Sequence, residues 1–141
     1  GNFWRFQMSK HYWVGGAMWG GTDDVLQQFI RRGYWYCWDI GDTPDSDSTS
    51  GNSVTTQRER FREIKRGDRI AVKKMLGRGA SEMEVRAIGI VKDVDHKEWR
   101  VYVKWLTTKS FSRIVPLKGC TASVHGPFEF ADDWTKEVFC I

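Results

Sequence analysis

In the middle of the chain, three neighbouring stretches read RIAVKK (Arg69–Lys74), EVRAIGIVKDV (Glu84–Val94) and WRVYVKWLT (Trp99–Thr107). Their apolar residues alternate with polar ones or run together, and many are β-branched or aromatic, which is typical of strands. A glycine-rich loop, Leu76–Ser81, joins the first two stretches, and a tight turn, Asp95–Lys97, joins the last two. Several short strands separated by polar turns predict a small barrel or a curled sheet.

The sequence before these stretches predicts a further strand and two helices. The aromatic and β-branched run His11–Val14 is expected to form a strand that stops at Gly15–Gly16. A helix is expected to begin at Thr22–Asp24, with the threonine as N-cap, and to end at Gly33. A second, short helix is expected over Gln57–Lys65, where apolar residues share one face.

The remaining segments are assigned by composition. The aromatic burst Tyr34–Trp38 follows the first helix, and the Ser- and Asp-rich stretch Asp39–Ser53 reads as a loop. Arg66–Asp68 is expected to turn, and Glu137–Ile141 is expected to form a terminal strand. The predicted fold class is therefore α+β, a curled sheet or small barrel flanked by short helices.

Length and composition place the chain among ordinary globular proteins. The 141 residues fit one domain, assigned to residues 11–141, with residues 1–10 interpreted as a leader or an added segment. No apolar run is long enough to span a bilayer, and no secretory signal is found. The three cysteines are far apart in the sequence, which argues against a disulfide framework and a zinc ribbon. A reducing cytoplasm is the simplest setting.

Two compositional features point toward nucleic acid. The chain has eight tryptophans and a net charge of +4. Indole rings stack on bases, and excess positive charge suits a phosphate partner. The competing interpretation is a Trp-rich core under a mildly basic surface, and composition alone favours neither.

The sequence offers little for catalysis. The three histidines, His11, His96 and His125, do not stand at metal-ligand spacing with one another or with a cysteine. Asp45, Glu63 and Lys65 imitate the acidic pair and lysine of Mg²⁺-dependent nucleases. Such groups need rigid neighbouring strands, whereas Asp45 falls in the polar loop and Glu63 in a predicted helix. We therefore expect a binding domain rather than an enzyme, with no cofactor and no metal.

Basic residues are dense between Arg58 and Lys74, where eight Lys or Arg face three acidic residues. A charge run of this kind is usually a solvated face, but these charges interleave with strands that also carry tryptophans. Such residues neutralise phosphates and give salt-dependent affinity. The candidate phosphate-binding residues are Arg58, Arg60, Lys65, Lys73, Lys74, Arg78, Lys104, Lys109 and Arg113.

Four tryptophans cluster early in the chain: Trp13, Trp19, Trp35 and Trp38. Two facing indoles make a slot for a flat ring, and a methyl group on a base adds apolar contact there. A base enters such a slot only when it is unpaired or flipped out of the helix. Core packing is the alternative role for each tryptophan. Asp39 is a candidate acceptor for a base amino group, against the alternative of a plain loop aspartate.

Several motifs, in this order, resemble the N-terminal EVE-like domains of prokaryotic McrB-type modification-dependent restriction proteins. The similarity extends over about residues 11–106, with a weaker echo near Glu137–Ile141. Its motifs are HYWVGGAMWGGTDD (His11–Asp24), FIRRGYW (Phe29–Trp35), IKRGDRIAVK (Ile64–Lys73), VRAIGIV (Val85–Val91) and VYVKW (Val101–Trp105). Many McrB-associated relatives carry a longer insert between the middle strands, and this chain lacks it.

The resemblance implies a PUA-like fold, the group that includes the EVE and YTH families, with a pocket for a modified base. That base is methylated adenine in RNA for YTH domains and a modified DNA base for the restriction-associated forms. Trp35 matches the position of one wall of the YTH aromatic cage. No tryptophan occupies Met75–Ser81, where a further wall is expected, so Met75, Leu76, Trp19 or Trp38 would replace it. This departure leaves the identity of the base open.

The leading hypothesis is a DNA-binding specificity module that reads a modified, flipped base in a restriction or phage-defence system. The alternatives are a YTH-like reader of methylated RNA, the nuclease, and a protein-interaction module whose tryptophans are core. The resemblance also implies a motor or nuclease domain in the same protein or as a partner subunit. The candidate base-binding residues are Trp13, Gly15, Gly16, Trp19, Trp35, Trp38, Asp39 and Met75.

Overall fold

The computed structural model describes residues 10–19, 23–37, 54–77 and 79–141. In this part of the chain the fold is mixed α+β, with one large sheet and three short helices. Residues 1–9 of the predicted leader or added segment 1–10 lie outside the described residues, as do residues 20–22, the 38–53 segment and Arg78. The predictions made for Trp38, Asp39 and Asp45 fall there as well.

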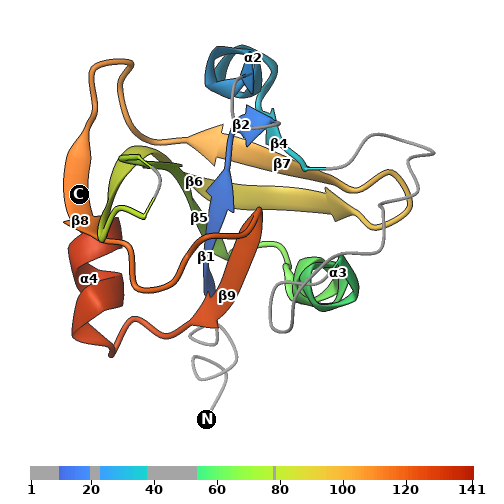
Figure 1. Ribbon diagram of the computed structural model, residues 1–141. Coiled ribbons are helices and arrows are strands. Elements are labelled where there is room, and N and C mark those ends of the chain that lie inside the picture. The colour runs from blue at the N-terminus through green and yellow to red at the C-terminus, as the bar shows by residue number, and fades with distance from the viewer. Residues whose placement is uncertain (1–9, 20–22, 38–53, 78) are drawn as a thin grey trace, which may run out of the picture.

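The large sheet has seven strands, of which six follow the order β4-β7-β6-β5-β1-β9 and the seventh, β8, also pairs with β6 (Figure 1). A two-stranded sheet of β2 and β3 stands beside it. The strands of the large sheet are β1 (Tyr12–Gly16), β4 (Tyr34–Trp35), β5 (Arg69–Met75), β6 (Glu82–Asp95), β7 (Arg100–Trp105), β8 (Arg113–Pro116) and β9 (Val124–Phe128). The small sheet pairs β2 (Met18–Trp19) with β3 (Asp23–Asp24).

The pairing of β1 with β5 is parallel, whereas the other pairings in the large sheet are antiparallel. Tyr12 stands opposite Arg69 and Gly16 opposite Lys73, so both strands run toward the same edge of the sheet. The antiparallel β9 then covers the other side of β1. Loops that follow β1 and β5 therefore meet the loop that precedes β9.

Side chains on both faces of β1 are buried, because alternating residues of the strand pack into two different clusters. Trp13 belongs to a cluster that includes Phe29 of helix α2 (Leu26–Arg32) and Phe61 of helix α3 (Val54–Glu63). Tyr12 and Val14 belong to a second cluster with helix α4 (Asp133–Phe139). Figure 1 shows α3 and α4 on either side of β1 and β9.

The middle strands and the helix stop at Gly33 are confirmed, and the turn between β6 and β7 is present but covers 96–99 rather than Asp95–Lys97. Gly33 has φ 73°, the left-handed conformation that glycine adopts without strain, and its N–H caps the Phe29 carbonyl. The second helix is also present, but its bounds are Val54–Glu63 rather than Gln57–Lys65.

The predicted beginning of α2 is wrong. Asp23 and Asp24 pair with Trp19 and Met18 as β3, and the helix begins only at Leu26. The Asp24 carboxylate still serves the helix, because it accepts a hydrogen bond from the Leu26 N–H at 3.1 Å. It also forms an ion pair with Arg86 at 2.8 Å. Tertiary pairing has therefore overridden a local helix-start signal.

The predicted terminal strand Glu137–Ile141 is also wrong, because this segment belongs largely to helix α4. The Asp132 side chain accepts a hydrogen bond from the Trp134 N–H and caps the helix. Trp134 and Val138, one turn apart, are buried on the same side. No helix in the described ranges is both long and apolar enough to cross a membrane.

Candidate functional site

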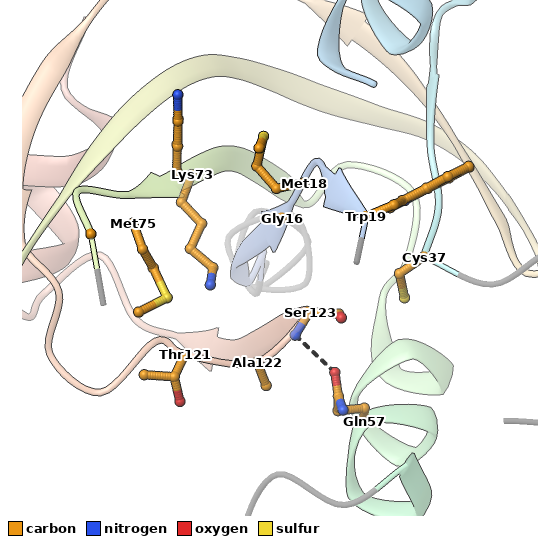
Figure 2. A pocket seen from close by; sticks show the side chains of 12 residues that line it. Gly16, Met18, Trp19, Cys37, Gln57, Lys73, Met75, Thr121, Ala122 and Ser123 are labelled. Atoms are coloured by element: carbon orange, nitrogen blue, oxygen red, sulfur yellow. Dashed lines mark hydrogen bonds between the residues drawn. The ribbon is translucent and has the colours of Figure 1, made fainter. Parts of the chain in front are cut away.

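A cavity of about 600 Å³ opens where β1 and β5 end together (Figure 2). Gly16 closes β1 at this edge, and Met18 and Trp19 of β2 follow it directly. The end of β5 supplies Lys73, Lys74 and Met75. The remaining lining residues are Cys37, Gln57, Gly77, Thr121, Ala122 and Ser123.

Backbone hydrogen bonds hold the 121–123 segment against this edge. The Gly16 N–H donates to the Ser123 carbonyl at 3.0 Å. The Ser123 N–H in turn donates to the Gln57 side-chain oxygen at 2.9 Å, which links the segment to α3 (Figure 2). The pocket rim is thereby assembled from strands and a helix rather than from one free loop.

Lys73 is the most buried cation of the pocket, with 6% of its surface exposed. Its ammonium donates to the Cys120 carbonyl. Among the described residues, no carboxylate lies within ion-pair distance of it. Burial lowers the pKa of Lys73 to about 8, and the Cys120 thiol opposes that shift. Because the buried charge of Lys73 has no carboxylate partner among the described residues, it favours an electron-rich ligand group inside the pocket.

A second positive charge lies behind the 121–123 segment. Arg60 of α3 donates to the Val124 carbonyl at 2.8 Å and lies 3.5 Å from Nδ1 of His125. The Ala122 N–H donates to Nε2 of His125 at 2.8 Å, so this nitrogen carries no proton. Burial lowers the pKa of His125 to about 4, helped by the charges of Arg60 and Lys73. The imidazole is therefore neutral at pH 7.

The opposite side of the pocket is apolar and sulfur-rich. Trp19 packs edge-on against Tyr36, with ring centroids 5.0 Å apart, and remains partly exposed. Its indole Nε1 is buried without a hydrogen-bond partner in the described part of the chain. Cys37 lies on this side as well, and burial raises the pKa of its thiol well above its usual value. Met18 also lines the pocket, and Met75 lies beside Lys73 at the end of β5 (Figure 2). Methionine adapts its shape to flat rings, so this wall suits a planar ligand.

Of the predicted base-binding residues, Gly16, Trp19 and Met75 line the cavity, whereas Trp13 and Trp35 are fully buried. The Trp13 indole donates to Asp68 Oδ2 at 2.9 Å. The Trp35 indole donates to the Gly16 carbonyl at 2.9 Å and stacks near Phe61.

Trp13 and Trp35 are therefore core residues in this structure and have no exposed face for a base. Trp35→Ala would leave a core cavity, at a cost of about 3–5 kcal/mol, and is no test of a cage wall. Gly15 belongs to the same packing, because an added Cβ would lie 2.6 Å from the Trp35 ring. Trp13, Trp35 and Gly15 therefore belong to the core next to the pocket, and other residues line the pocket itself.

Of the predicted phosphate-binding residues, Lys73 and Lys74 line the pocket, and Arg60 lies behind its rim. Arg58 stacks over the Trp99 ring at 5.0 Å. Lys65 forms an ion pair with the buried Asp68 at 2.9 Å. The side chains of Arg58 and Lys65 therefore interact with other residues of the protein in addition to carrying positive charge.

The other predicted phosphate contacts lie elsewhere. Arg113 donates to the carbonyls of Glu137 and Val138 at the end of α4, which is a structural role. Lys104 is exposed and stands opposite Ile90, which pairs with Arg69, so it lies at the far end of the sheet from the pocket. Lys109 is exposed in the segment between β7 and β8.

The sequence reasoning missed Met18, Cys37, Gln57 and the 121–123 segment. None of them carries a local signal for binding. They reach the pocket through the pairing of β9 with β1 and through the end of α3, both of which are long-range contacts.

The nuclease-like pattern receives no support from the residues that are described. Glu63 is exposed at the end of α3, and the Lys65 ammonium is bound to Asp68. No group of three or more His, Cys, Asp or Glu suited to a metal ion occurs within the described ranges.

Comparisons with protein-family models, with curated proteins and with solved structures gave no match to this chain.

Proposed function

We propose that the chain is a PUA-like, EVE-like binding module that reads a modified base in DNA. The observation that carries this proposal is the pocket at the shared end of β1 and β5, whose lining combines an indole, two thioethers and a buried lysine. The base enters this pocket after being flipped out of the duplex. The module binds and does not catalyse.

The dimensions and chemistry of the pocket support a base as the ligand. Its volume of about 600 Å³ falls within the range of roughly 300–1,000 Å³ usual for small-molecule sites. Trp19, Met18 and Met75 offer the apolar contact that a flat, methylated ring requires. Lys73 offers a fixed polar contact that orients the ring.

The surroundings of the pocket support a nucleic-acid partner. Lys74 and Gln57 line the pocket, and Arg60 of helix α3 lies behind the 121–123 segment. Positive charge of this kind binds the phosphate backbone without reading sequence.

The PUA-like assignment rests on the resemblance of the sequence motifs and agrees with the coarser α+β architecture. The motifs fall on β1, α2, β4, β5, β6 and β7, which form most of the large sheet and one of its helices. The same resemblance favours DNA as the ligand, a role in modification-dependent restriction, and an attached or partner motor or nuclease.

The test is a Trp19→Ala variant, with Trp99→Ala as a matched control. Both indoles are partly buried, but only Trp19 lines the pocket. We expect Trp19→Ala to lower the ratio of affinities for modified and unmodified duplexes about tenfold, since base–aromatic contact is worth about 1–3 kcal/mol. Trp99→Ala should leave that ratio unchanged.

The affinity ratio is the readout because it is insensitive to a general loss of charge or stability. Thermal melts of both variants establish that they fold. An unchanged ratio in folded Trp19→Ala would defeat the pocket assignment. A ratio that favours methylated single-stranded RNA in the unmutated chain would transfer the proposal to RNA.

A further inference from the structure

Among the described residues, Lys73 is the one buried lysine, with 6% of its surface exposed. Its side chain extends from β5 toward the end of β1, because a Cβ added to Gly16 would lie 4.0 Å from Lys73 Cε (Figure 2). Its nitrogen donates to the Cys120 carbonyl, next to the 121–123 segment that lines the pocket. The nitrogen therefore lies at the wall of the cavity, where only a molecule that enters the pocket contacts it.

The surroundings of Lys73 favour a neutral amine over an ammonium ion. No described carboxylate lies within ion-pair distance of it. The titratable groups nearby are the guanidinium of Arg60, the neutral imidazole of His125, the ammonium of Lys118 and the Cys120 thiol, which alone favours the charged lysine. Burial lowers the pKa of Lys73 to about 8. At pH 7.4 about 20% of such a lysine is neutral, against about 0.1% at the usual pKa of about 10.4.

A neutral amine in a cavity is a nucleophile toward carbonyl carbon, and desolvated lysines form Schiff bases for this reason. The hydrogen bond to the Cys120 carbonyl uses one N–H of Lys73 and leaves the nitrogen lone pair unused. That pair forms a bond to the carbon of an aldehyde, while the carbonyl oxygen takes up a proton that the nitrogen releases. The resulting carbinolamine loses water and leaves a C=N bond, so the step needs neither oxidant nor reductant.

The other lining residues indicate which aldehyde fits. The cavity of about 600 Å³ has room for a ring, and the partly exposed indole of Trp19 offers it an apolar contact. Lys74, which is more exposed than Lys73, lines the same cavity and suits an acidic substituent. We infer that Lys73 is a nucleophilic lysine that captures an acidic aromatic aldehyde in this cavity as a Schiff base. The reaction requires no nucleic acid, so the inference is independent of the proposed function.

The experiment treats the unmutated chain with 4-formylbenzoate and cyanoborohydride at pH 7.4, which reduces each imine to a stable amine. Mass spectrometry of the peptides measures the labelling rate at every lysine, in the folded chain and in guanidinium chloride. Lys73 should be labelled about tenfold faster in the folded chain than in the unfolded one, because folding raises its neutral fraction. Lys74 is the matched control and should be labelled no faster in the folded chain. An excess of 4-methylbenzoate, which lacks the aldehyde, should slow the labelling of Lys73 in the folded chain.

Two variants give a second measurement by intact mass. Lys73→Met keeps the length of the side chain and should lose the fast first adduct, whereas Lys74→Met should retain it. Labelling of Lys73 in the folded chain that is no faster than in the unfolded chain would overturn the inference, since burial without activation only slows a lysine. Fast labelling that 4-methylbenzoate leaves unchanged would place the reaction outside the cavity and would also overturn it. The peptide measurement uses the unmutated chain and therefore does not depend on the folding of a variant.

Discussion

Asp68 connects the beginning of β1 to the turn that precedes β5. Its carboxylate is fully buried and accepts hydrogen bonds from the His11 N–H at 3.0 Å and the Trp13 indole at 2.9 Å. It also accepts from the Lys65 N–H at 3.0 Å and the Lys65 ammonium at 2.9 Å. Sequence analysis assigns Asp68 only to a turn, because nothing local shows that Trp13 is its partner.

We predict that Asp68→Ala lowers the free energy of unfolding by about 3–5 kcal/mol, since it leaves a buried indole N–H and a lysine without their acceptor. Urea denaturation measures this change. Asp93→Ala is the control, because the Asp93 carboxylate is exposed and accepts only from the adjacent Val94 N–H. A loss below about 1 kcal/mol for Asp68→Ala would contradict the role given to this carboxylate.

His125 makes stability depend on pH. Its pKa in the folded chain is about 4, against a usual value of 6.5. Between these values the unfolded chain binds more protons than the folded one, so the free energy of unfolding falls as the pH is lowered. We predict a slope of up to about 1.4 kcal/mol per pH unit from this residue between about pH 6 and pH 4.

The measurement is urea denaturation at pH 7, 6, 5 and 4 for the unmutated chain and for His125→Gln. Glutamine supplies an acceptor for the Ala122 N–H but does not titrate in this range. The difference between the two chains removes the contribution of the carboxylates. Parallel pH profiles for the two chains would show that folding does not lower the pKa of His125, and would contradict this prediction.

At the level of elements, the two adjacent glycines at the end of β1 have different structural roles. Gly15 packs against Trp35, where an added Cβ would lie 2.6 Å from the ring. Gly16 faces the pocket, and the nearest atom to an added Cβ there is Lys73 Cε at 4.0 Å. One glycine therefore serves packing and the other borders the pocket.

We predict that Gly15→Ala lowers the free energy of unfolding by about 1–3 kcal/mol through overpacking. Gly16→Ala should leave stability within about 0.5–1 kcal/mol of the unmutated chain but weaken binding of the modified base, because its methyl group narrows the pocket beside Lys73. Thermal melts and duplex titrations of the pair measure both effects. Equal stability of the two variants would show that the Trp35 ring shifts easily to make room for the added methyl group, and that the packing at Gly15 is loose.

The elements that the sequence predicts well are those with local signals. The strands β5 to β7 carry period-two patterns, and α2 ends at a glycine whose left-handed conformation stops a helix. The strands β8 and β9 were missed because they are short and gain their definition from pairing with β6 and β1. The apolar run Val138–Ile141 resembled a strand, although Asp132 as a cap and the spacing of Trp134 and Val138 signalled α4.

The candidate site was predictable in part for the same reason. Trp19, Gly16 and Met75 were found because they follow recognisable strands. Trp13 and Trp35 were assigned to the pocket although they are core, since sequence alone does not tell an indole that lines a cavity from one that fills a core. The 121–123 segment comes to the site only through the fold.

On the scale of the whole molecule, charge and pocket contribute separately to binding. The net charge of +4 acts on any phosphate backbone, and this contribution weakens as salt is added. The contact between the pocket and a flipped base is short-ranged and releases few counterions. Affinity for every duplex should therefore fall with salt, while the ratio between modified and unmodified duplexes should stay nearly constant.

The most direct measurement is a titration of the unmutated chain at two salt concentrations with matched duplexes. These duplexes are unmodified or carry N6-methyladenine, 5-methylcytosine or 5-hydroxymethylcytosine, and a methylated single-stranded RNA is measured alongside. We predict that one modified duplex is preferred over the unmodified one by about tenfold or more, at both salt concentrations. Equal, weak and salt-sensitive binding to every ligand would leave only a basic surface and contradict the account of the pocket as a base reader.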